Sequence, residues 1–176
     1  MDINSKKYRI GFFSFIKPGI LPFSVFILFI LAYIPLLAYT YSTDKQLGAW
    51  IVAIIWICFM GVPPLVLHLN YFLHDRKKCL VVNNVERIIT LTESLNEHSI
   101  RYDEIERIEK YHSKGSGEGF KPKMPWHTYY FYKIIVKDKE PVFISRMIQD
   151  NFEKKIEGIC FKFIRVFYPK IKLTKF

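Results

Sequence analysis

Two long apolar runs, separated by a short polar loop, dominate the first half of the chain. Residues 18–43 and 46–74 contain no charged side chain, so each run exceeds the roughly 20 apolar residues that cross about 30 Å of hydrocarbon. The first run also lacks the polar face that a helix on a soluble core carries. This pattern predicts a transmembrane helical hairpin over residues 18–73, with spans at about 20–41 and 49–73.

Glycine and prolines interrupt both apolar runs and predict kinks in the membrane-spanning helices. These residues are Pro35 in the first run and Gly61, Pro63 and Pro64 in the second. Such kinks free backbone carbonyls that other groups must satisfy. His68, Asn70 and His74 cluster where the second run ends. Polar residues at a membrane boundary account for this cluster more simply than a metal site does, so no metal site is assigned.

From residue 79 the apolar positions follow a period typical of strands. Short β-forming segments at 79–82, 87–92, 126–136 and 141–144 are separated by polar turns. They predict a small antiparallel β-barrel within a second module, residues 74–176. The chain then shows apolar residues at spacings of three and four, which predict a C-terminal helix over about 146–168. This stripe consists of Ile148, Phe152, Ile156, Ile159, Phe163 and Phe167.

The charge distribution orients the predicted hairpin. The net charge is +10, and the excess lies in the lead at residues 1–17 and in everything from residue 74 onward. Because cytoplasmic segments next to membrane spans are rich in Lys and Arg, both termini are expected in the cytoplasm. The same charge can lie against anionic lipid headgroups, so nucleic acid is not expected as a partner. The three cysteines are widely spaced and are expected to be reduced.

A glycine-rich loop at 113–125 and the strand that follows it supply a candidate surface for a ligand or partner. Aromatic rings there could stack on a base, and lysines could meet a phosphate. The candidate residues are Lys114, Lys121, Lys123, Trp126, Tyr129 and Tyr130. The aromatic members also fit ordinary core and cross-strand packing.

Catalysis is not expected from this sequence. His98, His112 and His127 fall in separate segments without a nearby nucleophile or paired acid. The acidic residues between 103 and 109 alternate with basic ones, as on a solvated surface. No enzyme activity and no cofactor are therefore predicted.

Three segments carry a resemblance to a known family. They read PPLVLHLNYFLHDRKKCLVVNNVERIITLT, IRYDEIERIEKY and MPWHTYYFYKIIVKDKEPVFIS. The chain resembles small bacterial membrane proteins in which a two-helix hairpin precedes a cytoplasmic pleckstrin-homology-like (PH-like) domain. The resemblance implies a partly open barrel of two antiparallel sheets, closed at one end by the C-terminal helix. It also implies a non-catalytic module that binds proteins, peptides or lipid headgroups at the inner membrane of a bacterium.

Two functions from different classes stay open at this point. In the first, the hairpin anchors the barrel in the bilayer and the barrel recruits a protein partner; an immunity protein against a membrane-directed toxin is a special case. In the second, the chain is similar in plan to transmembrane effectors of cyclic-oligonucleotide anti-phage systems. That alternative requires a small-molecule or nucleotide ligand, and homo-oligomers that disrupt the membrane when the ligand binds.

Overall fold

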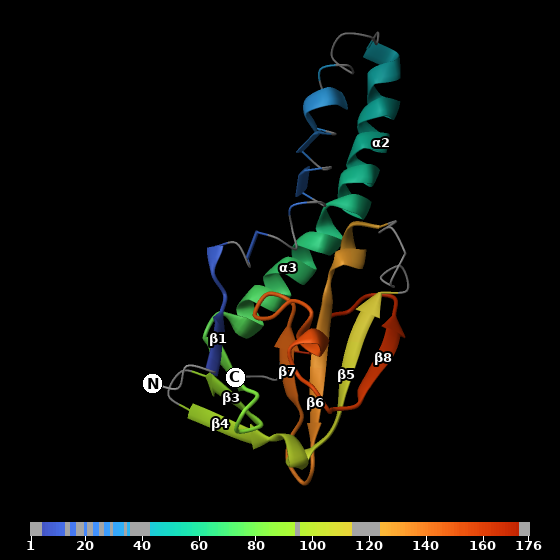
Figure 1. Cartoon of the computed structure of the whole chain (residues 1–176). Helices are drawn as coiled ribbons and strands as arrows, with labels where there is room; N and C mark the ends of the chain where they lie inside the picture. Colours follow the sequence, from blue (N-terminus) through green and yellow to red (C-terminus); the bar gives the residue numbers. More distant parts are fainter. Residues whose placement is uncertain are drawn as a thin grey trace.

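The computed structural model describes residues 5–12, 15–16, 20, 23–24, 27–28, 30–33, 35, 43–93, 96–113 and 124–172. Within these residues it is built mostly from strands (Figure 1). The helices are α2 (Thr43–Met60) and α3 (Val62–Asp75), and short 3-10 turns are η1 (Tyr102–Glu104), η2 (Pro125–Thr128) and η3 (Phe152–Lys154). The strands are β1 (Ser5–Arg9), β2 (Lys78–Asn83), β3 (Ile88–Glu93), β4 (Asn96–Arg101), β5 (Ile105–Ser113), β6 (Tyr130–Val136), β7 (Val142–Ser145) and β8 (Phe161–Val166).

The strands form two four-stranded sheets, in the orders β1-β2-β3-β4 and β7-β6-β5-β8. All neighbours are antiparallel except β5 and β8, which are parallel. Side chains alternate between the two faces of a strand, and one face of each sheet faces a shared core. This core includes Leu80, Ile89, Ile108, Tyr132, Ile134 and Ile144, all fully buried.

In sequence, β1 precedes the long apolar segment and β2 follows it, yet the two strands pair. Ser5 lies opposite Asn83 and Arg9 lies opposite Cys79. Residues 10–77 are therefore an insertion between two neighbouring strands of one sheet. The chain leaves this sheet at the end of β1 and returns to it at β2.

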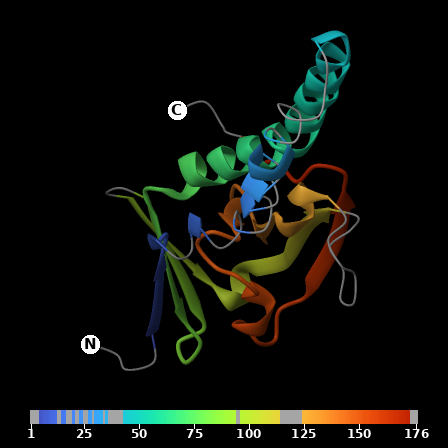
Figure 2. The same cartoon turned by 90° about the horizontal axis from the view of Figure 1, so that it is seen from above.

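The helices α2 and α3 follow each other but have different surroundings. The helix α2 projects away from the sheets, whereas α3 lies across the second sheet (Figures 1 and 2). Leu67 and Tyr71 of α3 are fully buried against Trp126, Tyr129 and Phe131. The opposite face of α3 leaves apolar side chains exposed, namely Val62, Leu65, Val66, Leu69 and Leu73.

The predicted N-terminal two-helix transmembrane hairpin is wrong as a description of this fold. The described residues begin with a strand, and they contain one helix that is long and apolar enough to cross a membrane, Trp50–Asp75. Of the first predicted span, 20–41, the structure describes residues 20, 23–24, 27–28, 30–33 and 35, and the remainder lies outside the described residues. Counting uncharged residues misled the prediction, because His68, Asn70 and Tyr71 give α3 a face that docks on the domain.

The predicted barrel and its C-terminal helix are also wrong. The two sheets do not close into a barrel. In place of a helix over 146–168, the chain forms turns, η3 and the strand β8. Asn151 and Gly158 adopt left-handed conformations, with φ of 54° and 78°, and these interrupt any α-helix. Ile148, Phe152 and Ile156 still enter the core between the sheets, but from turns.

Candidate functional site

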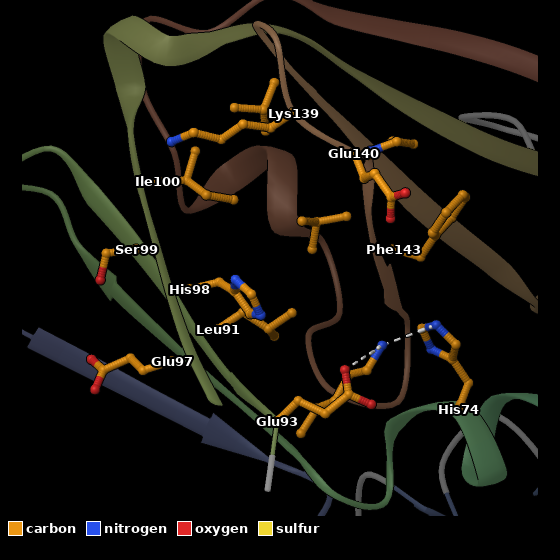
Figure 3. Close-up of a pocket in the computed structure, with 14 residues that line it drawn as sticks. His74, Leu91, Glu93, Glu97, His98, Ser99, Ile100, Lys139, Glu140 and Phe143 are labelled. Carbon is orange, nitrogen blue, oxygen red and sulfur yellow. Dashed lines mark hydrogen bonds and ion pairs between the residues drawn. The ribbon is translucent and has the colours of Figure 1, made fainter. Parts of the chain in front are cut away.

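An open groove of about 770 Å³ lies between β4 of the first sheet and β7 of the second (Figure 3). We call it the β4–β7 groove. Its apolar lining includes Leu91, Ile100, Val142 and Phe143. Charged and polar side chains surround this lining, namely Glu93, Glu97, His98, Ser99, Lys139 and Glu140. The groove therefore combines an apolar bottom with a polar rim.

A chain of polar contacts closes the groove where α3 ends. Asp75 is fully buried, and one of its carboxylate oxygens lies 2.5 Å from His74 Nδ1. His74 Nε2 lies 3.0 Å from Lys78 Nζ, and Lys78 lies 3.9 Å from Glu93 (Figure 3). Burial lowers the pKa of Lys78 from its ordinary value, although the charges of Asp75 and Glu93 oppose this effect. The network joins the last turn of α3 to the first sheet.

Both walls of the groove are edge strands. Within the described residues, β4 pairs only with β3, and β7 pairs only with β6. The sequence favours this arrangement, because Asn96, Glu97, His98 and Ser99 are polar and exposed, as edge strands commonly are. An edge strand carries backbone groups that can pair with another chain.

The aromatic residues of the predicted ligand surface lie in the interior. Trp126 packs edge-on against Phe59, and the two ring centroids are 5.7 Å apart. The hydroxyl of Tyr129 lies 3.1 Å from His68 Nδ1. Tyr130 belongs to the other core cluster, between the sheets. The packing role that the sequence left open therefore describes these three side chains, and they do not form one exposed surface.

The rest of the predicted site is only partly described. Lys114, Lys121 and Lys123 lie outside the described residues, so their role in binding a ligand stays a prediction. Pro35 lies in a helical position, but its neighbours are outside the described residues.

The other predicted kink residues lie together. Gly61 separates α2 from α3, and Pro63 and Pro64 occupy the first turn of α3. The helix axis changes direction there (Figure 1). His68 and Asn70, considered above as metal ligands, instead contact Tyr129 and the backbone of Ile171.

Sequence reasoning missed the β4–β7 groove because no continuous motif encodes it. Its walls come from residues 91–100 and 136–143, which belong to different sheets. The run of polar residues at 96–99 beside a strand pattern is typical of an exposed edge strand, and it could have indicated one wall of the groove. It does not indicate which strand forms the other wall.

Comparison with known protein families identifies the family of this chain. Residues 6–154 match the family model described as "PH domain", and this match covers most of the chain. The protein belongs to the PH domain family, which confirms the PH-like domain predicted from the sequence. No curated protein and no solved structure matches it. PH domains are protein- or lipid-interaction modules and are generally non-catalytic.

Proposed function

We propose that this protein is a membrane-anchored interaction module whose β4–β7 groove binds an extended segment of a protein partner. The observation that carries the proposal is that β4 and β7 face one groove and that, among the described residues, no strand pairs with the groove side of either. Addition of a peptide strand to an exposed sheet edge is a common mode of peptide recognition. No chemical step is involved.

The hydrogen bonds around β7 support strand addition at this edge. The backbone N–H of Ser145 points away from β6 and donates to Asp75 Oδ2 at 3.1 Å. Residues two apart on a strand direct their backbone groups to the same side, so the N–H of Phe143 also points away from β6. Asp75 therefore covers one end of the edge and leaves Phe143 for a peptide. Pro141, two residues earlier, has no N–H to offer.

The side chains of the groove define the chemistry of the partner segment. Glu97 and Glu140 are exposed on the rim, whereas Lys139 pairs with Glu104 at 2.8 Å. The lining beneath them is apolar. A strand that alternates apolar and basic side chains would place its apolar side chains in the groove and its basic side chains near Glu97 and Glu140.

We further propose that the domain is held at the cytoplasmic face of a bacterial inner membrane. The support is the apolar surface of α2, where Ile51, Val52, Ile54 and Ile55 are each at least half exposed. Only 17% of the most apolar stretch of the helix Trp50–Asp75 is buried, unlike the core helix of a soluble domain. Arg76, Lys77 and Lys78 follow at once, as cytoplasmic boundaries favour.

Peptide binding to the full-length chain tests the groove. The protein is placed in phosphatidylcholine nanodiscs and titrated with a synthetic peptide of alternating valine and lysine. We expect binding that weakens about tenfold or more in the double variant Glu97→Lys, Glu140→Lys. The matched control, Glu106→Lys with Glu157→Lys, changes the net charge equally at exposed positions outside the groove. Equal loss in both double variants, or no binding at all, would refute the proposal.

A second pair of variants separates strand addition from side-chain contact. Phe143→Pro removes the outward N–H and the ring, whereas Phe143→Ala removes only the ring. Proline is tolerated on edge strands when the missing N–H faces away from the sheet. We expect Phe143→Pro to bind the peptide more weakly than Phe143→Ala. Equal affinity in these two variants would show that the peptide does not bond to the β7 backbone.

A further inference from the structure

The polar contacts at the end of α3 fix the hydrogen-bond roles of one histidine. One ring nitrogen of His74 faces the Asp75 carboxylate and the other faces the Lys78 amine (Figure 3). A carboxylate only accepts hydrogen bonds, and an ammonium group only donates them. Nδ1 of His74 therefore carries the proton toward Asp75, and Nε2 accepts from Lys78 at 3.0 Å. Both contacts together require a neutral imidazole.

The two partners of His74 differ in how firmly they are held. Asp75 is fully buried, and its second carboxylate oxygen accepts from the backbone N–H of Ser145 at 3.1 Å. Lys78 has an alternative partner, because Glu93 lies 3.9 Å away. This distance is longer than a hydrogen bond, so the lysine has room to approach Glu93. A change at His74 is therefore relieved by movement of Lys78 rather than of Asp75.

A second proton on His74 is incompatible with the present contact to Lys78. Histidine is the side chain whose charge ordinarily changes between about pH 5 and 8. An imidazolium ring donates from both nitrogens, so Nε2 no longer accepts from Lys78 and two positive charges face each other. Burial already lowers the pKa of Lys78, against the charges of Asp75 and Glu93. A further positive neighbour drives its ammonium group toward Glu93.

The β4–β7 groove has a small negative charge while its histidines are neutral. Its charged lining consists of three glutamates and two lysines, namely Glu93, Glu97, Glu140, Lys78 and Lys139. A second histidine of the lining, His98, lies exposed on β4. One proton taken up by His74 cancels the excess negative charge of this lining.

We propose that His74 makes the β4–β7 groove sensitive to pH, because its protonation breaks the contact with Lys78 and weakens binding of the apolar and basic partner segment. The inference rests on the proposed function, since it concerns the regulation of the same groove. The new positive charge appears next to Phe143, whose ring centroid lies 6.5 Å from that of His74. At the same time Lys78 neutralises Glu93. The partner is therefore bound near neutral pH and released in acid.

Peptide affinity at two pH values tests this switch. The full-length protein in phosphatidylcholine nanodiscs is titrated with the valine–lysine peptide at about pH 7.5 and about pH 5.5. We expect the dissociation constant to be about threefold or more higher at the lower pH. This ratio should fall close to one in His74→Gln, which cannot take up the proton.

The matched control is His98→Gln, which removes the other histidine of the groove. Each variant is compared with itself at the two pH values, so a change in its overall affinity cancels. His98→Gln should keep the ratio of the wild type. A ratio that survives in His74→Gln, or that disappears in His98→Gln, would overturn the proposal.

A measurement without peptide separates the switch from the proposed function. Isotope-labelled lysine side chains are followed by NMR as the pH is lowered, and Lys78→Arg assigns the signal of Lys78. This signal should shift together with the ring signal of His74, and the shift should be absent in His74→Gln. Lys139, which pairs with Glu104 at 2.8 Å, is the reference lysine within the groove.

The outcomes distinguish the two proposals. A Lys78 signal that does not follow His74, or equal peptide affinity at both pH values, refutes the switch and leaves the peptide groove in place. Failure of the peptide to bind at either pH refutes the groove as a peptide site and the release step with it.

Discussion

Glu153 organises the turn-rich segment between β7 and β8. It accepts from Lys110 Nζ at 2.6 Å and from the hydroxyl of Tyr132. Lys110 lies over the ring of Tyr130, 4.2 Å from its centroid, so its charge contacts both a carboxylate and an aromatic face. This cluster ties η3 to β5 and β6 and holds Phe152 in the core. Side-chain contacts from this segment thus cover the part of the core that the sequence analysis expected a C-terminal helix to cover.

Replacing Glu153 by glutamine should destabilise the fold by about 1–2 kcal/mol at neutral pH, because two hydrogen bonds to a charged acceptor are weakened. Burial raises the pKa of Glu153, but the bonds from Lys110 and Tyr132 outweigh it and the pKa is lowered from 4.5. A depressed carboxyl pKa contributes stability above the unfolded value, and this contribution is lost as pH falls through the folded value. Thermal unfolding should therefore show the gap between the wild type and E153Q closing below pH 4.5.

Glu157→Gln is the matched control for that experiment, since Glu157 is exposed on the same segment. Its unfolding should follow the wild type at every pH. A gap between the wild type and E153Q that stays constant down to the acid limit would contradict the assigned role of Glu153.

At the scale of elements, α3 is the piece that connects the insertion to the domain. One face packs on the second sheet and on the segment 168–171, and the other face is apolar and exposed. Its last turn supplies His74 to the β4–β7 groove and Asp75 to the backbone N–H of Ser145. A single helix therefore joins the exposed apolar surface, the β4–β7 groove and the segment 168–171.

The substitution Asn70→Ala should release the segment 168–172 from α3. Asn70 is buried and makes both hydrogen bonds to Ile171, so its loss leaves a backbone N–H and a carbonyl unpaired, at a cost of about 1–3 kcal/mol. Hydrogen exchange of the Ile171 amide should become faster, while exchange in β2 and β3 stays slow. Asn96→Ala, at the exposed start of β4, serves as control. Unchanged exchange at Ile171 in Asn70→Ala would show that other contacts hold this segment.

The segment 146–168 shows how an apolar pattern can predict the wrong element. The residues Ile148, Phe152 and Ile156 are spaced by four and are buried, as a helical stripe predicts. Ile159 is still partly buried against this core. The last two members of the stripe, Phe163 and Phe167, are 59% and 73% exposed, because the chain has turned at Gly158 and formed β8. A spacing of four can arise from successive turns as well as from a helix, and only the pairing of β8 with β5 distinguishes the two.

At the scale of the whole molecule, the apolar insertion starts and ends in one sheet. Because β1 and β2 are hydrogen-bonded neighbours, the domain assembles from residues on both sides of the insertion. In the proposed membrane arrangement, both ends of the insertion lie on the same side of the bilayer. The orientation of the domain then follows from α3 rather than from a flexible linker.

Native cysteines allow this arrangement to be measured. Cys58 and Cys160 are exposed in the fold, and Cys79 is buried. If α2 lies in the bilayer, a membrane-impermeant maleimide should label Cys160 in inside-out vesicles and leave Cys58 unlabelled until detergent is added. In intact spheroplasts neither should react. Cys58→Ala and Cys160→Ala assign each label, and Cys58 reacting as fast as Cys160 without detergent would contradict the membrane placement.

The sequence by itself determined the strands β2, β3, β6 and β7 and the position of the long apolar runs, whereas it missed β1 and placed β8 in a helix. The features it did determine depend on local periodicity and on runs of apolar residues, which a stretch of the chain carries within itself. The PH-like class followed from the resemblance of three segments to a known family. The strand pairs β2–β3 and β6–β7 join neighbours in sequence and could be predicted in the same way.

The tertiary structure alone decided the pairing of β1 with β2, the docking of α3 and the candidate site. Cys79 and Arg9 are opposite each other across a long insertion, and Asn70 bonds to a residue 101 positions away. The β4–β7 groove likewise joins side chains from three or more separate segments. A pattern within one segment carries no information on which distant segment will cover it, because that choice is made by packing and hydrogen bonding across the whole fold.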